Sequence, residues 1–447
     1  MSGRVRAQSV FSEYVRYAIA NIVGMLGLSC YILADTFFVS KGMGSDGLAA
    51  LNFAIPVYTA VHGCGLMLGM GGATRYALAK GQGDDAQADR AYTATLWMTL
   101  GFSVAFVALG LGAADGMARL LGADGPVRDM TRTYLRFLLL FSPAFLLNDV
   151  LLCFVRNDGA PRLAMCAMLT GSLFNIVFDY IMIFPLRLGI LGAVLATGVS
   201  PLISVGVLAT HWLRRRNGFR PVRAKIAATT FGSILSLGVP SLVGELSGGI
   251  VMIVFNLVFL RQAGNVGVAA YGVVANLAMV VIAVYTGLAQ GVQPLFSRAC
   301  GTGDDATLAR TARYAIATVA ALALAIYAIL CLCASPIAGI FNRDRDPQLQ
   351  SIATFGLRLY FIATPFIGWN IVIAAYFTSV KRAAPAHAIA LLRGLVLIVP
   401  TIFALESVAG LTGVWLALPL TEALVCALGV AVYVRARAAS GGKRRRQ

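Results

Sequence analysis

Twelve long apolar segments constrain the fold of this chain more than any other feature. Each is about 20 residues or longer, the length that an α-helix needs to cross roughly 30 Å of hydrocarbon. Only 12% of the residues are charged and the mean hydropathy is +0.80, whereas a soluble domain carries roughly 25% charge. The segments do not alternate apolar with polar residues as barrel strands do. They lie near residues 13–39, 48–77, 91–113, 131–154, 162–184, 189–213, 228–260, 267–298, 312–334, 350–378, 386–407 and 411–435.

The basic residues are distributed unevenly between alternate loops. With the N-terminus in the cytoplasm, about 25 of the 36 Lys and Arg residues fall on the cytoplasmic side, as the positive-inside rule requires. We therefore expect a multi-pass protein of the bacterial inner (plasma) membrane with both termini cytoplasmic. The net charge of +17 then reflects topology and contact with anionic lipid headgroups. Because this charge is spread over seven loops, nucleic-acid binding is not expected.

The second half of the sequence repeats the first. With an offset of 220 residues, KGQGDDA at 80–86 aligns with CGTGDDA at 300–306, and Gly44 aligns with Gly264. With an offset of 222, Pro143 aligns with Pro365. Each copy holds six helices, so both copies start on the same side of the membrane and form a parallel repeat.

The repeat predicts an all-α integral membrane protein with twelve transmembrane helices in two six-helix lobes. The expected parts are an N-terminal lobe at 1–213, a cytoplasmic connector at 214–227, a C-terminal lobe at 228–435 and a basic cytoplasmic tail at 436–447.

Acids inside the predicted helices are the main functional candidates, because a charge is costly within the bilayer. From their distances to the helix starts, Asp35 and Asp179 both fall in the outer half of the membrane, where they could meet. Asn175 precedes Asp179 by four residues and shares its helix face. Two neighbouring carboxyl groups beside an amide would suit a proton or sodium site. The alternative is that either acid caps a helix end near the outer headgroups.

The repeat places this chemistry in the N-terminal half alone. The positions equivalent to Asp35 fall near Phe255 and Asn256, and those equivalent to Asp179 fall near 399–401, where no acid occurs. Glu245 and Glu422 lie near mid-depth in their own helices, and each could be a structural carboxyl or contact a substrate cation.

Other polar groups are given structural roles. Asn148 and Asp149 lie toward the cytoplasmic end of their helix, so they are interpreted as gate or packing residues. His62 and His387 lie on apolar helices and are interpreted as core histidines. The eight cysteines show no metal spacing and are expected to be free thiols. With three histidines in all, no metal site and no enzyme activity are expected.

Several motifs give the chain a specific resemblance. ADTFFV at 34–39, LAALNFAIP at 48–56, FNIVFDYIMIF at 174–184, GVPSLVGE at 238–245 and AQGVQPLFS at 289–297 resemble, in this order, segments of the multidrug and toxic compound extrusion (MATE) transporters. The similarity covers nearly the whole chain. It implies a central cavity that opens alternately to each side, and uptake of H⁺ or Na⁺ that drives export of cationic, amphipathic compounds.

The resemblance also implies roles for particular residues. Asp35, Asn175 and Asp179 match the ion-coupling network of the DinF-like branch, and Thr197 resembles a further member. Glu245 matches an acid linked to cation binding in the other main branch. Where that branch has a second acid this chain has Asn370, so a complete sodium site in the C-terminal lobe is not expected.

The predicted function is therefore secondary active multidrug efflux by antiport. The expected partners are amphipathic cations, H⁺ or Na⁺ and membrane lipids, with no cofactor beyond the coupling ion and a monomer as the functional unit. The candidate substrate or cation contacts are Glu245, Asn370 and Glu422. A flippase for a lipid-linked saccharide or a related amphiphile is the alternative. It would need several basic residues in its cavity, whereas Arg393 is nearly alone within the helices.

Overall fold

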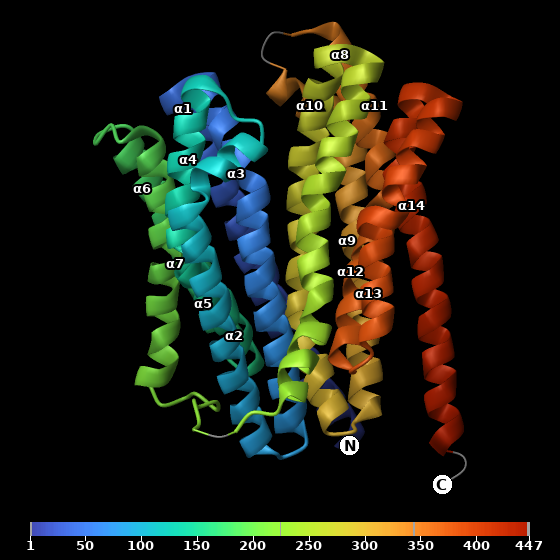
Figure 1. Cartoon of the computed structure of the whole chain (residues 1–447). Helices are drawn as coiled ribbons and strands as arrows, with labels where there is room; N and C mark the ends of the chain where they lie inside the picture. Colours follow the sequence, from blue (N-terminus) through green and yellow to red (C-terminus); the bar gives the residue numbers. More distant parts are fainter. Residues whose placement is uncertain (1, 224, 343–344, 445–447) are drawn as a thin grey trace. The chain divides into compact units, whose positions relative to one another are not determined.

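The structure, a computed structural model, describes residues 2–223, 225–342 and 345–444, with side chains for 9–44, 46–223, 225–342 and 345–435. Within these ranges the chain is helical except for short turns and a longer non-helical segment at 214–223 and 225–227, and it contains no β-strand (Figure 1). The helices of the N-terminal half are α1 (Ser2–Gly81), α2 (Asp85–Gly112), α3 (Ala114–Leu120), α4 (Gly125–Leu140), α5 (Ser142–Asn157), α6 (Pro161–Ile183) and α7 (Gly189–Leu213). Those of the C-terminal half are α8 (Ala228–Gly301), α9 (Asp305–Leu332), α10 (Ala334–Phe341), α11 (Pro347–Tyr360), α12 (Thr364–Ser379), α13 (Ala383–Leu391) and α14 (Ile398–Arg444).

Two of these helices are far too long for one crossing. At about 1.5 Å per residue, the 80 residues of α1 and the 74 of α8 would each extend beyond 100 Å. Both are interrupted by a glycine with positive φ, Gly44 (φ 64°, ψ −148°) and Gly264 (φ 60°, ψ −153°), a conformation open essentially only to glycine. Gly410 interrupts α14 in the same way. The helices of the described residues therefore make twelve membrane spans, which confirms the predicted fold class.

The internal repeat is visible in the backbone. Gly44 and Gly264 are repeat partners, and both form the sharp turn between two spans. Asp84 accepts a hydrogen bond from the Gln87 amide at 2.9 Å, and Asp304, 220 residues later, caps α9 through the Thr307 amide at 3.0 Å. Equivalent residues thus hold equivalent turns.

The fourth span of each half is broken at the same place. Helices α4 and α5 meet at Phe141 with a bend of 49°, and Pro143 lies in the first turn of α5. In the second half a 3-10 turn at Phe361–Ala363 separates α11 from α12, and Pro365 follows it. Proline removes a backbone donor and clashes with the preceding turn, so the helix bends at this point in both copies.

The chain forms two compact units. One contains 1–246 and 290–311, and the other contains 247–289 and 312–447. The first unit therefore includes parts of α8 and α9 as well as the N-terminal half. The domain boundaries expected from the sequence describe the repeat rather than this packing, and they stay a prediction. Of the expected tail at 436–447, the helix continues to Arg444, and residues 445–447 lie outside the described residues.

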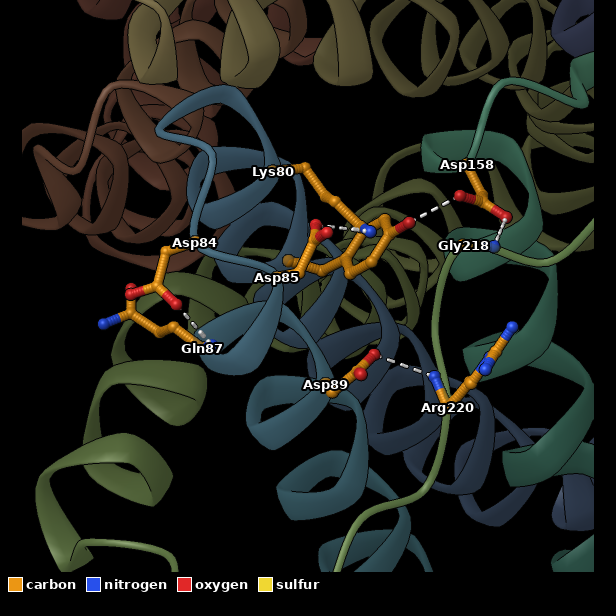
Figure 2. Close-up of polar contacts among 9 residues, drawn as sticks. Lys80, Asp84, Asp85, Gln87, Asp89, Asp158, Gly218 and Arg220 are labelled. Carbon is orange, nitrogen blue, oxygen red and sulfur yellow. Dashed lines mark hydrogen bonds and ion pairs between the residues drawn. The ribbon is translucent and has the colours of Figure 1, made fainter.

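The connector after α7 is attached to the N-terminal unit by Asp158. The Asp158 carboxylate accepts hydrogen bonds from the Tyr76 hydroxyl at 2.5 Å and from the Gly218 amide at 2.7 Å. Figure 2 shows Asp158 pointing toward Gly218 in the connector. His211 Nε2 lies 2.8 Å from Oδ2 of Asp158, the oxygen that also accepts from the Gly218 amide. Phe219 is completely buried beside these groups.

Candidate functional site

Asp35 and Asp179 come together in the N-terminal half. Asp35 lies on the first span of α1 and Asp179 on α6, and their carboxyl groups lie close enough to interact electrostatically. Asp179 is completely buried and Asp35 is 7% exposed. Glycines allow this close approach, since a Cβ added to Gly27 would lie only 2.5 Å from Leu169 of α6. Small residues at such positions are typical of membrane helices in close contact.

The other two residues predicted for this site lie beside the acid pair. The Asn175 amide of α6 donates to Thr197 Oγ1 of α7 over 3.5 Å, and both side chains are buried. Tyr134 of α4 adds a buried hydroxyl close to Thr197 and close enough to both acids to interact electrostatically. The sequence reasoning missed Tyr134, because one tyrosine among 15 in an apolar chain carries no distinguishing signal.

The acid pair has no basic partner among the described residues. Four buried oxygens accept no hydrogen bond from the described residues: Asp179 Oδ1 and Oδ2, Asp35 Oδ1 and Asn175 Oδ1. An ionised carboxylate only accepts hydrogen bonds, so two carboxylates in contact need a proton or a cation between them. These four buried oxygens belong to neighbouring side chains, and together they suit the binding of a small positive ion.

A cavity of about 70 Å³ lies beside this site within the same unit. Thr197 and Tyr31 line it on the side of the acid pair, and Met25, Phe145 and Met168 contribute apolar walls. Tyr31 is four residues before Asp35, and its hydroxyl is 2.7 Å from the Tyr58 hydroxyl. The cavity thus has a deformable, polarisable lining of the kind that suits apolar cations.

Asn148, Asp149 and Glu245 belong to this cavity region and not to the acid pair. Asn148 and Asp149 line the cavity, and Asp149 Oδ2 is 2.9 Å from His62 Nδ1. Glu245 of α8 interacts electrostatically with His62. Their predicted roles, gate or packing for the first two and cation contact for Glu245, stay predictions.

Arg156 lines the cavity from near the C-terminal end of α5. Its Nη1 donates to Asn21 Oδ1 at 2.7 Å and to Gln290 Oε1 of α8 at 2.6 Å, and the residue is 2% exposed. The sequence reasoning counted Arg156 with the cytoplasmic loops, because the predicted span ended at 154, whereas α5 extends to Asn157. The structure places it inside the protein, a position that the positive-inside rule alone does not reveal.

Glu422 and Asn370 lie in the second unit, where Glu422 already has a basic partner. Arg393 donates to Glu422 Oε1 at 2.9 and 3.1 Å, and the Asn370 amide donates to Oε2 at 2.7 Å. Arg393 lies on a short π-helical turn, Leu392–Val396, between α13 and α14. The structure brings these two candidates together in a satisfied ion pair, and Glu245 belongs to the other unit.

A twelve-span parallel repeat with a polar cavity among its helices defines a multi-pass membrane transporter rather than an enzyme. The family model described as MatE matches residues 21–181 and 240–404, which is most of the chain. The chain therefore belongs to the MATE family of transporters.

Curated relatives agree with this assignment. The chain is 26% identical over 428 residues to the multidrug export protein MepA of Staphylococcus saprophyticus, and the match covers 95% of this chain and 94% of the relative. MepA of Staphylococcus haemolyticus is also 26% identical, over 94% of this chain and 92% of the relative.

Solved structures match over nearly the whole chain. A multidrug resistance MATE transporter of the MOP superfamily in an outward-facing conformation has a TM-score of 0.90 at 26% identity, covering 96% of each chain. A MOP superfamily transporter from Pyrococcus furiosus has a TM-score of 0.88 at 27% identity, again over 96% of each chain. Its description says that the reverse polarity of its binding pocket suggests a different function. The fold, the family and multidrug efflux thus have support from independent comparisons.

Proposed function

We propose that this multidrug efflux transporter is a secondary antiporter whose coupling ion, H⁺ or Na⁺, binds at Asp35 and Asp179. The observation that carries the proposal is the buried carboxyl pair with no basic partner among the described side chains. A proton shared by the two carboxyl groups would satisfy the pair. A sodium ion would instead find oxygen atoms from both acids and from Asn175 and Thr197.

Coupling would follow from differential binding of this ion. An ion shifts the population of two conformations only if it binds one of them more tightly. Neutralising the acid pair would change the favoured packing of α1 against α6, because two unscreened carboxylates repel and a bridged pair attracts. We propose that this change alternates the access of the cavity, in a protein that acts as a monomer.

The exported compounds are proposed to be amphipathic cations. The relatives are named multidrug export proteins, and the cavity combines aromatic and methionine walls with the carboxylate of Asp149. The flippase alternative would need several basic residues in the cavity to bind phosphate. Among the described residues Arg156 is the one arginine or lysine that lines it, and Arg393 is paired with Glu422, so this alternative gains no support. The acids on α1 and α6 also support a place in the DinF-like branch.

Transport in vesicles tests the coupling. Purified protein would be reconstituted into proteoliposomes loaded with a fluorescent cationic dye, and a pH gradient and a sodium gradient would be imposed in separate experiments. We expect one gradient to drive dye transport in the wild type and neither to do so in Asp35→Asn. Equal transport with no gradient, or full driven transport in Asp35→Asn, would contradict the proposal.

Orientation in the inner membrane, with the connector and both termini cytoplasmic, is part of the same proposal. Gly218 is unsuitable as a labelling site, since a Cβ there would collide with Asp158 and Tyr76. Exposed Arg216 is a better position, with Leu186 in the predicted outer loop as the control. In a variant without the native cysteines, an impermeant thiol reagent added to intact cells should label Leu186→Cys and not Arg216→Cys. The reverse pattern would invert the topology.

A further inference from the structure

A second cluster of ionisable side chains lies beside the cavity, apart from Asp35 and Asp179. His62, on the second span of α1, has its Nδ1 2.9 Å from Asp149 Oδ2 of α5. The Asp149 side chain is 6% exposed and that of His62 is 16% exposed, and both line the cavity. A histidine and a carboxylate in contact within the bilayer form either an ion pair or a neutral hydrogen bond, according to where the proton lies.

Glu245 of α8 is the third member of this cluster. A Cβ added to Gly63, the residue after His62, would lie 3.2 Å from Glu245 Cβ, so Gly63 lets α8 approach the turn that carries His62. The carboxylate interacts electrostatically with both His62 and Asp149. When both acids are ionised, the cluster carries a net charge of −1 with a protonated histidine and −2 with a neutral histidine.

The other groups near His62 are aromatic or uncharged, apart from Arg156 and the more distant acid pair. The Tyr58 ring stacks on the imidazole with centroids 5.9 Å apart and planes 8° apart, and Tyr31 lies behind Tyr58. Arg156 is two helical turns from Asp149 on α5, about 10 Å along the axis. Helices α6 and α7 line the cavity with uncharged side chains only. Beyond Tyr31 lie Asp35 and Asp179. Among the side chains that the structure describes, the one cation in direct contact with Asp149 would therefore be His62 itself.

We propose that Asp149 and Glu245 bind the positively charged group of the exported compound, and that the His62 imidazolium occupies this place when no compound is bound. Binding would release the His62 proton to water, so one proton leaves for each monovalent cation that enters and the charge of the cluster is unchanged. Neutral His62 and the stacked Tyr58 ring would then pack against the bound cation, an arrangement that aromatic faces favour.

This inference rests on the proposed export of cations, and it adds a site where substrate and proton exclude each other directly. The acid pair would couple the ion gradient to the conformational change, and the His62 cluster would select the charge of the compound. The two sites are connected through Tyr31 and Tyr58, whose hydroxyls are 2.7 Å apart. Proton release on binding therefore has two sources, which the experiment must separate.

Proton release by full-length protein in lipid nanodiscs, without any gradient, tests the inference. The probe is the cation tetraphenylphosphonium. The protein carries Asp35→Asn, so that Asp35 and Asp179 no longer share a proton that binding of the probe could release. We expect about one proton released per cation bound near neutral pH, and an affinity that rises with pH. Adding His62→Gln, which keeps a hydrogen-bonding side chain, should reduce the release to near zero and make the affinity independent of pH between about 6 and 9.

Three further variants test whether proton release and cation binding depend on this cluster in particular. Asp149→Asn should weaken tetraphenylphosphonium binding at least about tenfold, and Glu245→Gln should weaken it by a smaller factor. His211→Gln is the matched control: His211 is also buried against an aspartate, Asp158 at 2.8 Å, but lies outside the cavity, so proton release should be retained.

The outcomes separate this inference from the proposed coupling. Undiminished proton release in the His62→Gln variant, or unchanged affinity in Asp149→Asn, would overturn the inference even if Asp35→Asn abolishes driven transport. Conversely, full driven transport in Asp35→Asn would refute the coupling proposal while leaving the binding result intact. If Asp149→Asn does not fold, the comparison of His62→Gln with His211→Gln decides the question.

Discussion

The two halves of the molecule share the same order of helices and turns, but their buried acids differ in whether they have a basic partner. In the N-terminal half, Asp35 and Asp179 face each other without a basic partner among the described side chains. In the C-terminal half the position equivalent to Asp35 is Phe255, which stacks on Tyr271 with ring centroids 5.1 Å apart. The buried acid of that half, Glu422, is held by Arg393.

The difference teaches that the repeat specifies geometry and not chemistry. Arg393 and Glu422 touch across two helices, and 222 residues earlier Gly171 and Ser200 touch in the same way, with the Ser200 hydroxyl donating to the Gly171 carbonyl at 2.7 Å. One copy of the contact is an ion pair and the other is a small hydrogen bond. A carboxyl pair that lacks a cation can exchange an ion, whereas an acid bound to arginine is already neutralised.

The largest expected effect concerns the acid pair. Asp35→Asn and Asp179→Asn should each lose nearly all gradient-driven efflux, because the ion can no longer bind one conformation more tightly than the other at this site. The double variant should be little worse than either single one, because both residues bind one ion and act as a unit. Dye efflux from cells, normalised to the amount of folded transporter in the membrane, measures this. Multiplicative losses in the double variant would mean that the two acids act independently.

Stability should respond most strongly in the other half. Glu422→Gln would leave the Arg393 guanidinium without its carboxylate, a change that costs about 3–5 kcal/mol for buried pairs. We expect a lower thermal unfolding midpoint of the purified protein but normal transport per folded molecule. Arg393→Met combined with Glu422→Gln should recover most of the loss, because no unpaired charge remains. A double variant as unstable as Glu422→Gln would show that the ion pair itself, and not the unpaired charge, matters.

A smaller effect is expected at the connector. Asp158→Ala would leave the Tyr76 hydroxyl, His211 and the Gly218 amide without their acceptor, at a cost of about 1–3 kcal/mol. The connector should then be cleaved faster by trypsin, which cuts after the arginines that follow α7. Asp85→Ala is the control, since its ion pair with Lys80 involves a side chain that is 77% exposed and should contribute little. Equal cleavage of both variants would exclude an anchoring role for Asp158.

The smallest effect is expected outside the membrane spans, at Asp115. Arg128 donates to both oxygens of this carboxylate at 2.8 Å and lowers the pKa of Asp115. A lowered pKa means that the pair stabilises the fold above the ordinary carboxyl pKa and loses this contribution as the pH falls through the lowered value. Asp115→Asn should therefore lower the unfolding midpoint by about 1 °C at pH 7, and the difference should vanish in acid. If the difference in unfolding midpoint between the wild type and Asp115→Asn grew as the pH fell, the Asp115–Arg128 pair would not be its cause.

Most of the fold could be predicted from the sequence, because the spans and the turns between them are each specified by a short stretch of residues. Hydropathy marks each span, and the glycines at 44, 264 and 410 occupy turns that essentially only glycine adopts. The meeting of Asp35 with Asp179 also follows from depth along two helices. Contacts that depend on helix rotation and tilt do not follow. The pairing of His62 with Asp149, the hydroxyl of Tyr134 beside the acids and the burial of Arg156 each required the packed helices.

The central claim is that the ion gradient acts on the N-terminal half. The direct test compares two variants in proteoliposomes under imposed pH and sodium gradients: Asp35→Asn, and the neutral pair Arg393→Met with Glu422→Gln. The account predicts that Asp35→Asn loses driven dye transport while still binding dye, and that the neutral pair keeps transport near the wild-type rate per folded molecule. Driven transport that persists in Asp35→Asn and is lost in the neutral pair would place the coupling ion in the C-terminal half and contradict the account.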